Sequence, residues 1–215
     1  MYMTFDRLVK EFGSFPFFDL STVLQISGEN ESNVRTQLHR WMKSGKITAL
    51  RRGMYSISDM YRKAVLYLAV LANELYKPSY LSLLWALNYY GVFPEKVVTY
   101  TSVTSRVPRA FTNQFGVFQY SHVKQSCFFG FSAHIIQGQS IWLADPEKAL
   151  LDMWHLNAGE WSVERLSSMR FQNFELVDNK KLMGYAEQYK SPRLFRAVQE
   201  WETLEELEKE GETTL

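Results

Sequence analysis

Residues 30–58 carry a helix pattern followed at once by a hairpin pattern, and this succession limits the folds open to the chain more than any other feature. Asn30 is a favourable N-cap, and Glu31 places an acid in the first turn, where the helix dipole favours an anion. Gly45 supplies a stop after the last turn. The sequence therefore predicts one helix of about three and a half turns here.

The hairpin follows directly, with short strands predicted over 46–50 and 54–58. Arg51, Arg52 and Gly53 form the turn between them. Two arginines at the tip of a hairpin suit contacts with phosphate or with a groove of DNA, because the guanidinium group is planar and always charged.

Two shorter helices are predicted before this segment. Residues 3–12 have apolar positions at helical spacing and end near Gly13. Asp19 is a plausible N-cap for a second helix, which Gly28 ends and whose expected buried side holds Leu20, Val23, Leu24 and Ile26. Three helices and a hairpin, with a brief turn between the second and third helix, predict a winged helix-turn-helix domain over residues 1–58.

The third helix is amphipathic. Its apolar side gathers Val34, Leu38, Trp41 and Met42. If that side is buried, short polar groups face outward near the N-terminus and cations face outward further along, as in a helix that enters the major groove. The residues predicted to contact DNA, including the two arginines of the turn, are Ser32, Asn33, Arg35, Thr36, His39, Arg40, Lys43, Arg51 and Arg52.

The charge distribution agrees with this prediction. The net charge is only +1, but the segment 32–58 contains six Lys and Arg and no acid. The last sixteen residues hold one base and seven acids, which hide the basic character of the rest. A solvated basic face, or a winged helix that binds protein, remains the alternative interpretation. The acidic end of the chain is expected to be a solvated helix end, with a cover for a basic partner surface as the weaker alternative.

Residues 59–215 are expected to form a larger α+β domain, in which helices flank a mostly antiparallel or mixed sheet. Predicted helices cover 60–75, 79–90, 145–156, 178–189 and 192–209, and predicted strands cover 97–103, 109–112, 117–122, 127–136 and 140–144. The strands are rich in aromatic residues. Most of these are expected in the core, while others are candidates for a partner-binding patch.

The residues point away from catalysis. The chain has no glycine-rich phosphate loop, no H-E-x-x-H and no G-x-S-x-G. Cys127 is the sole cysteine, which excludes an internal disulfide and any multi-cysteine metal site. We expect no enzyme activity, cofactor or metal; a metal-dependent nuclease built on Asp145, Glu147 and Lys148 is a weaker alternative, because Asp145 and Pro146 are explained as a helix start.

Cytoplasmic localisation is expected. Charged residues interrupt every candidate signal sequence at the N-terminus. The longest apolar run, 64–72, has nine residues, well short of the roughly 20 that a membrane helix needs.

Four stretches carry a family resemblance: LRRGMYSIS at 50–58, PSYLSLLWALNYYGVFPE at 78–95, TYTSVTSRVPRAFTNQFGVFQYSHVKQSCFFGF at 99–131 and ADPEKALLDMWHL at 144–156. In their order and spacing, the chain resembles the AbiEi-type antitoxins of bacterial type IV toxin-antitoxin systems, which are also transcriptional regulators. The resemblance implies a winged helix that binds inverted repeats in double-stranded promoter DNA and represses its own operon.

The same resemblance implies that the C-terminal domain counteracts a nucleotidyltransferase-like toxin without a stable antitoxin–toxin complex. The resemblance implies that Arg51 and Arg52 contact DNA, and it implies no residue-level mechanism for the C-terminal domain. A stand-alone regulator without a toxin, and a protein-binding adaptor, remain the alternatives.

Overall fold

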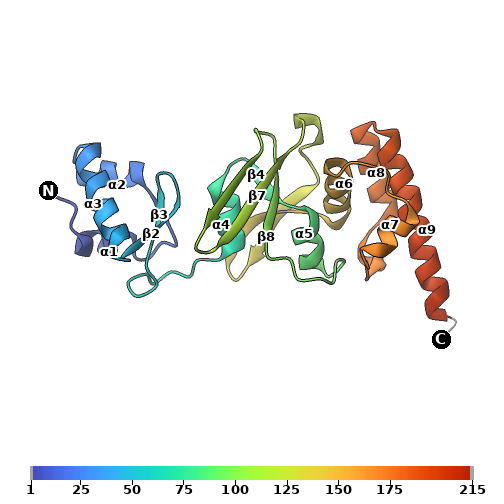
Figure 1. Cartoon of the computed structure of the whole chain (residues 1–215), viewed down its shortest axis with the longest axis horizontal. Helices are drawn as coiled ribbons and strands as arrows, with labels where there is room; N and C mark the ends of the chain where they lie inside the picture. Colours follow the sequence, from blue (N-terminus) through green and yellow to red (C-terminus); the bar gives the residue numbers. More distant parts are fainter. Residues whose placement is uncertain (1, 214–215) are drawn as a thin grey trace. The chain divides into compact units, whose positions relative to one another are not determined.

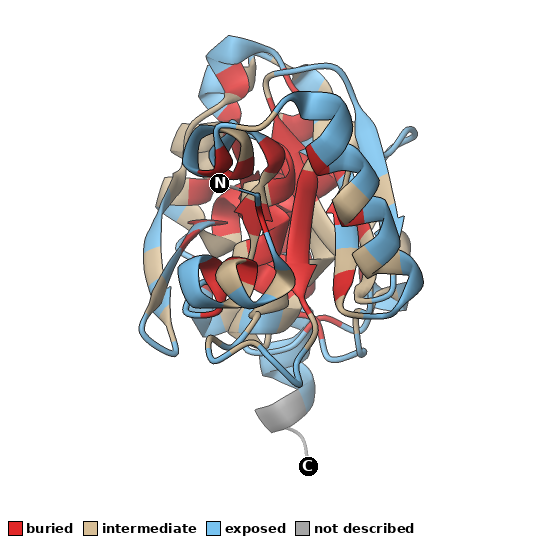
Figure 2. Cartoon of the chain, turned by 90° about the vertical axis from the view of Figure 1, so that its left-hand side faces the viewer, coloured by how far each residue is buried: buried red, intermediate tan, exposed pale blue. Residues whose placement is uncertain are grey.

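The computed structural model describes residues 2–213, which form two compact units. Unit 1 runs to Leu71 and includes Asn113–Phe115. Unit 2 holds Ala72–Thr112 and the chain from Gly116 onward. Helices and sheets are both present, so the expected α+β class is confirmed. Figure 2 shows helices that are buried along one side and exposed along the other, as their amphipathic sequences predict.

Unit 1 contains three helices and a small sheet (Figure 1). In chain order its elements are α1 (Phe5–Phe12), β1 (Phe18–Asp19), α2 (Leu20–Ser27), α3 (Glu31–Lys43), β2 (Ile47–Arg51) and β3 (Met54–Ile57). The strands pair antiparallel in the order β1-β3-β2. The helices and the hairpin therefore lie where the capping and turn residues predicted them.

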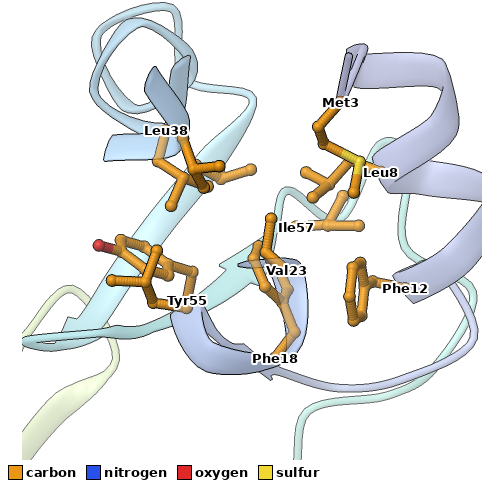
Figure 3. Close-up of a cluster of buried hydrophobic side chains, with 11 residues drawn as sticks. Met3, Leu8, Phe12, Phe18, Val23, Leu38, Tyr55 and Ile57 are labelled. Atoms are coloured by element: carbon orange, nitrogen blue, oxygen red, sulfur yellow. The ribbon is translucent and has the colours of Figure 1, made fainter. Parts of the chain in front are cut away.

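One core holds unit 1 together, and Figure 3 shows its side chains pointing toward one another from all three helices and from the sheet. The buried members are Met3, Leu8, Phe12, Phe18, Leu20, Val23, Val34, Leu38, Ile47, Tyr55 and Ile57. The rings of Phe12 and Phe18 stack at 4.9 Å, and Phe18 stacks on Tyr55 at 5.8 Å. Burial of such side chains contributes about 1.5–3 kcal/mol each, which fixes the orientation of every helix in the unit.

The expected buried side of α2 was wrong at one position. Leu20 and Val23 are buried, but Ile26 is exposed and Leu24 is half-buried. Helical geometry places Ile26 roughly 120° around the axis from Leu20, outside the side that meets the core.

Unit 2 is built on a six-stranded mixed sheet with strand order β6-β7-β5-β4-β9-β8. Its strands are β4 (Ser79–Leu81), β5 (Tyr100–Thr104), β6 (Arg109–Asn113), β7 (Gly116–His122), β8 (Phe131–Ile136) and β9 (Gln139–Ala144). The β5–β7 and β4–β9 pairs are parallel, whereas β4–β5 and β8–β9 are antiparallel. The expected mixed sheet is thus present.

The helices of unit 2 are α4 (Leu68–Leu75, which begins in unit 1), α5 (Leu83–Tyr90), α6 (Pro146–Leu156), α7 (Val163–Ser168), α8 (Asn179–Tyr189) and α9 (Pro192–Thr213). Two 3-10 turns, η1 (Gln125–Cys127) and η2 (Phe174–Leu176), complete the elements. Helix α6 packs beside α5 and α8, and α9 packs beside α7 and α8 (Figure 1). The sequence did not predict α7.

The predicted helix over 60–75 was wrong in its first half, because α4 begins only at Leu68. Tertiary hydrogen bonds hold the preceding segment instead. The buried guanidinium of Arg62 donates to the Pro16 carbonyl oxygen and to the Ser56 hydroxyl, and the Lys63 amide donates to the Gly13 carbonyl oxygen at 2.7 Å. These bonds with distant residues replace the local ladder of a helix.

The predicted helix over 79–90 was also wrong at its start, because Ser79–Leu81 is a strand that lies between β5 and β9. The strand predicted over 97–103 begins at Tyr100. The strand predicted over 127–136 begins at Phe131, since residues 125–127 form η1 and Gly130 turns the chain at φ +71°. A short apolar run is compatible with either a helix or a strand. Pairing with strands far along the chain determined which of the two formed, as for Ser79–Leu81.

Candidate nucleic-acid interface

Helix α3 is fixed at its start by its own cap and along its length by the core. The Asn30 side-chain oxygen accepts a hydrogen bond from the Asn33 amide at 2.9 Å. Val34 and Leu38 are buried, and Trp41 and Met42 are partly buried against the same cluster. The apolar side of α3 therefore faces inward, as its sequence predicted.

The opposite side of α3 is open to solvent. All seven of its predicted DNA-contacting residues are exposed: Ser32, Asn33, Arg35, Thr36, His39, Arg40 and Lys43. The small polar side chains stand in the first two turns and the cations of Arg40 and Lys43 in the last turn. The helix thus presents hydrogen-bonding groups at one end of its exposed side and positive charge at the other.

Two of these side chains also bond within α3. The Arg35 guanidinium forms an ion pair with Glu31, with Nη2 and Oε1 2.5 Å apart. The Thr36 hydroxyl donates to the Ser32 carbonyl oxygen at 2.9 Å, which leaves its oxygen free only to accept. The charge of Arg35 is therefore partly offset by Glu31, and Thr36 can accept a hydrogen bond from a base but has no proton left to donate to a phosphate.

The two arginines of the hairpin turn lie in different surroundings. Arg51 ends β2 and is half-buried; its Nη2 lies 3.7 Å from Oδ1 of Asp19, and its Nη1 donates to the Arg52 carbonyl oxygen at 3.2 Å. Arg52 is exposed in the turn itself, followed by Gly53 at φ +79°. Arg51 thus ties the turn to the start of α2, while the Arg52 side chain projects from the turn.

Lys46 and Arg62 serve the packing of unit 1, whereas Lys10 and Lys63 are exposed outside α3 and the hairpin. The Lys46 ammonium lies over the Phe5 ring, 4.6 Å from its centre, and the Arg62 guanidinium is buried and ion-paired with Asp59. Across residues 2–213, the structure gives no hydrogen bond or ion pair to the side chains of Arg40, Lys43 and Arg52. These three cations form the open positive charge of the candidate interface.

The acids of unit 1 are mostly engaged elsewhere. Glu31 pairs with Arg35, Asp19 with Arg51 and Asp59 with Arg62. Glu29 accepts from the Met3 amide and from the Gln37 side chain. Few carboxylates are therefore left to offset the open cations.

Unit 2 contains a buried polar network that the sequence analysis did not identify. Lys148 and Asp152 are both fully buried on α6 and form an ion pair. The Asp152 carboxylate also accepts from the hydroxyls of Tyr80 at 2.9 Å, Ser82 at 2.8 Å and Tyr189 at 2.7 Å. A lysine and an aspartate four residues apart within the largely apolar run 148–154 were the signal for it.

This network shifts the ionisation of its phenols. Burial first, and then the negative charge of Asp152, raise the pKa of Tyr80 and Tyr189 well above the ordinary tyrosine value. Both side chains therefore stay protonated donors to Asp152. Lys148 and Asp152 have no exposed surface, so their ion pair joins α6 to Tyr80, Ser82 and Tyr189 inside unit 2.

The residues of the weaker nuclease alternative are held in similar internal bonds. Asp145 stands at the N-cap of α6, but its carboxylate accepts from the Tyr185 hydroxyl and pairs with Lys181 at 3.0 Å. Lys181 also pairs with Glu147 at 3.0 Å. Within residues 2–213 no group of three or more His, Cys, Asp or Glu side chains is placed to hold a metal ion.

Among the residues that the structure describes, no helix combines the length and the hydropathy required to span a bilayer. A comparison with models of known protein families gives no match, and a comparison with curated proteins gives no significant similarity.

Proposed function

We propose that this protein is a transcriptional regulator that binds duplex DNA through α3 and the β2–β3 turn of unit 1. The observation that carries the proposal is where the unpaired cations of α3 and the hairpin lie in unit 1. Lys46, Arg35 and Arg62 are engaged in internal interactions, whereas Arg40, Lys43 and Arg52 are open on α3 and the hairpin turn. A basic surface of this kind, on an element that fits a groove, is the electrostatic footprint of a DNA-binding protein.

The order of elements supports a winged helix-turn-helix. Helices α2 and α3 are joined by the three-residue turn 28–30, in which Gly28 has φ +67°. Helix α3 is followed by the β2–β3 hairpin, and β1 adds a third strand beside β3. A helix of thirteen residues is roughly 20 Å long, enough to lie along a major groove with its N-terminal residues near the base edges.

Salt dependence of DNA binding tests the proposal. Each phosphate contact contributes a slope of about −0.9 in log K against log salt concentration. If Arg40, Lys43 and Arg52 each neutralise one phosphate, their contacts alone weaken binding ~40-fold between 50 and 200 mM salt. Replacing Lys43 or Arg52 with alanine should lower the magnitude of the slope by about 0.9.

Two matched variants control this experiment. Lys10→Ala removes an exposed cation from α1, and Lys63→Ala removes an exposed cation that follows the hairpin and lies outside the candidate interface. Both should leave the slope close to that of the unchanged protein. Promoter binding that is absent, or that is equally weakened by Lys10→Ala and Arg52→Ala, would reject the interface and favour a protein-binding adaptor.

Sequence preference is proposed to come from the N-terminal turns of α3. The Asn33 side chain carries an amide, which can pair bidentately with adenine in the major groove. Asn33→Ala is expected to relax preference at one base position by about 1–3 kcal/mol while keeping the salt slope. Binding selection from a random duplex library measures both quantities together.

For unit 2 we propose the antitoxin role, and its support is the resemblance of segments 78–95, 99–131 and 144–156 to AbiEi-type antitoxins. Co-expression should then relieve the growth arrest caused by a nucleotidyltransferase-like protein encoded beside this gene. The triple variant Arg40→Ala, Lys43→Ala, Arg52→Ala should lose repression and keep the relief. Growth arrest that persists with the unchanged protein would leave a stand-alone regulator.

A further inference from the structure

Strand β8 lies at the edge of the unit 2 sheet and lacks the features by which proteins usually protect such an edge. Residues 125–144, which include all of β8 and β9, contain no Lys, Arg, Asp or Glu. In the part of the chain that the structure describes, no strand pairs with the outer side of β8. A six-residue uncharged edge is a template for another strand, since its outward amides and carbonyls need partners.

The other sheet edges are protected. At the opposite end of the same sheet, β6 begins at the exposed Arg109, close to the exposed Arg106. In unit 1, β1 has only two residues and β2 ends at Arg51. Charge or short length thus guards these edges, and β8 differs from them.

One face of the β8–β9 hairpin is largely apolar, and most of it is exposed. Ala133 lies directly opposite Trp142, and Ile135 lies opposite Ser140, so these four side chains share a face. Ile135 is 70% exposed and Trp142 is 49% exposed. An apolar face beside an open edge is typical of an interface between proteins.

We infer that a second copy of this chain occupies the edge, with the two β8 strands paired antiparallel about a two-fold axis. Charge is compatible with self-pairing. A strand paired with its own copy places like charges near each other, and β8 has no Lys, Arg, Asp or Glu to be opposed in this way. A two-fold axis gives each copy the same contacts, as in most homodimers. The inference depends on unit 2 alone and is independent of the proposed DNA binding.

The side chains select the register. Directly opposed residues must lie on the same face, so the two well-overlapped registers are centred on Ala133 or on His134. Centring on Ala133 sets Ile135 against Phe131 of the second copy, a ring already packed on Tyr80 at 4.3 Å. Centring on His134 sets Ile135 against Ala133 of the second copy instead. The two hairpins then form four adjacent strands. One row of side chains across them runs from Trp142 and Ala133 of one copy to Ile135 and Ser140 of the other, so large and small side chains alternate.

A charge placed at the edge tests the inference. Ile135→Lys brings two ammonium groups into the paired edge, and we expect self-association to weaken at least tenfold, about 1.4 kcal/mol. Val98→Lys is the matched control, because Val98 is also an apolar residue of unit 2 with 70% exposure but lies outside β8 and β9. Sedimentation velocity over a concentration series of the full chain, without DNA, measures the association constant.

Cross-linking tests the register. His134→Cys sets two thiols opposite each other across the axis, where Cα atoms lie about 4.5–5.5 Å apart, within disulfide range. Ser132→Cys would hold its thiols on positions roughly 13 Å apart along the strands. Mild oxidation should link His134→Cys and neither Ser132→Cys nor the unchanged protein, whose Cys127 is buried.

Three results would overturn the inference: an unchanged protein that stays monomeric at hundreds of micromolar, equal weakening by Ile135→Lys and Val98→Lys, or preferential linkage of Ser132→Cys. Circular dichroism of each variant verifies that its fold is intact. Since both exposed positions accept lysine without burying its charge, the comparison does not depend on a folding defect.

Discussion

The Lys148–Asp152 ion pair leads to a sharp prediction about the stability of unit 2. In Asp152→Asn the side chain keeps its shape but loses its charge, so the fully buried ammonium of Lys148 has no counter-charge. The amide nitrogen that this substitution introduces would also face donors, since three hydroxyls donate to the carboxylate now. Removing one partner of a buried pair costs about 3–5 kcal/mol, a large part of the stability of a typical domain.

A double-mutant cycle isolates the pair. Lys148→Met removes the cation and its contacts with the aromatic rings around it. In the variant that carries both changes no uncompensated charge remains, so its cost should fall short of the sum of the single costs by up to about 3 kcal/mol. Urea unfolding followed by tryptophan fluorescence reports mainly on unit 2, which holds five of the six tryptophans.

The control for this cycle is an exposed pair in the same unit. Glu160 and Arg196 form an ion pair at 2.8 Å, and both are exposed to solvent. Because water screens such pairs, Glu160→Gln should leave the unfolding transition unchanged within error. If Asp152→Asn shifts the transition no further than Glu160→Gln does, the reasoning about the buried charge is wrong.

Three further predictions concern the backbone, pH and helix capping. Gly130→Ala should destabilise the protein more than Gly138→Ala in thermal melts. Both glycines have positive φ, where an alanine costs about 1–2 kcal/mol of stability. In addition, a Cβ at Gly130 would lie 2.9 Å from the Tyr185 side chain, whereas a Cβ at Gly138 would contact nothing. Burial and the Asp152 charge raise the pKa of Tyr189. Its contribution to the free energy of unfolding is therefore present below about pH 10 and is lost as the pH rises further. Tyr189→Phe should reduce this loss of stability at alkaline pH, as measured by urea unfolding at a series of pH values. Asn30→Ala removes the cap of α3 and should cost about 0.5–2 kcal/mol of stability by urea unfolding, and no loss would show that the cap contributes little.

The sequence by itself determined the three helices and the hairpin within residues 1–58 and the exposed side of α3. Asn30, Gly28 and Gly53 fix local geometry through their own side chains or their positive φ values, so they signal caps and turns without knowledge of the rest of the chain. The spacing of Val34 and Leu38 likewise sets which side of α3 is buried. Such signals are local, and for that reason they are legible in a sequence.

Tertiary structure decided whatever depends on partners far along the chain. Residues 79–81 form a strand because β5 and β9 lie on either side of it, and residues 60–67 leave the helical path because Arg62 bonds to Pro16 and Ser56. The same holds for charge: the sequence counts cations, but only the fold pairs Arg51 with Asp19 and leaves Arg52 open. Hydrogen bonds and ion pairs between distant residues depend on distances that the folded chain alone sets.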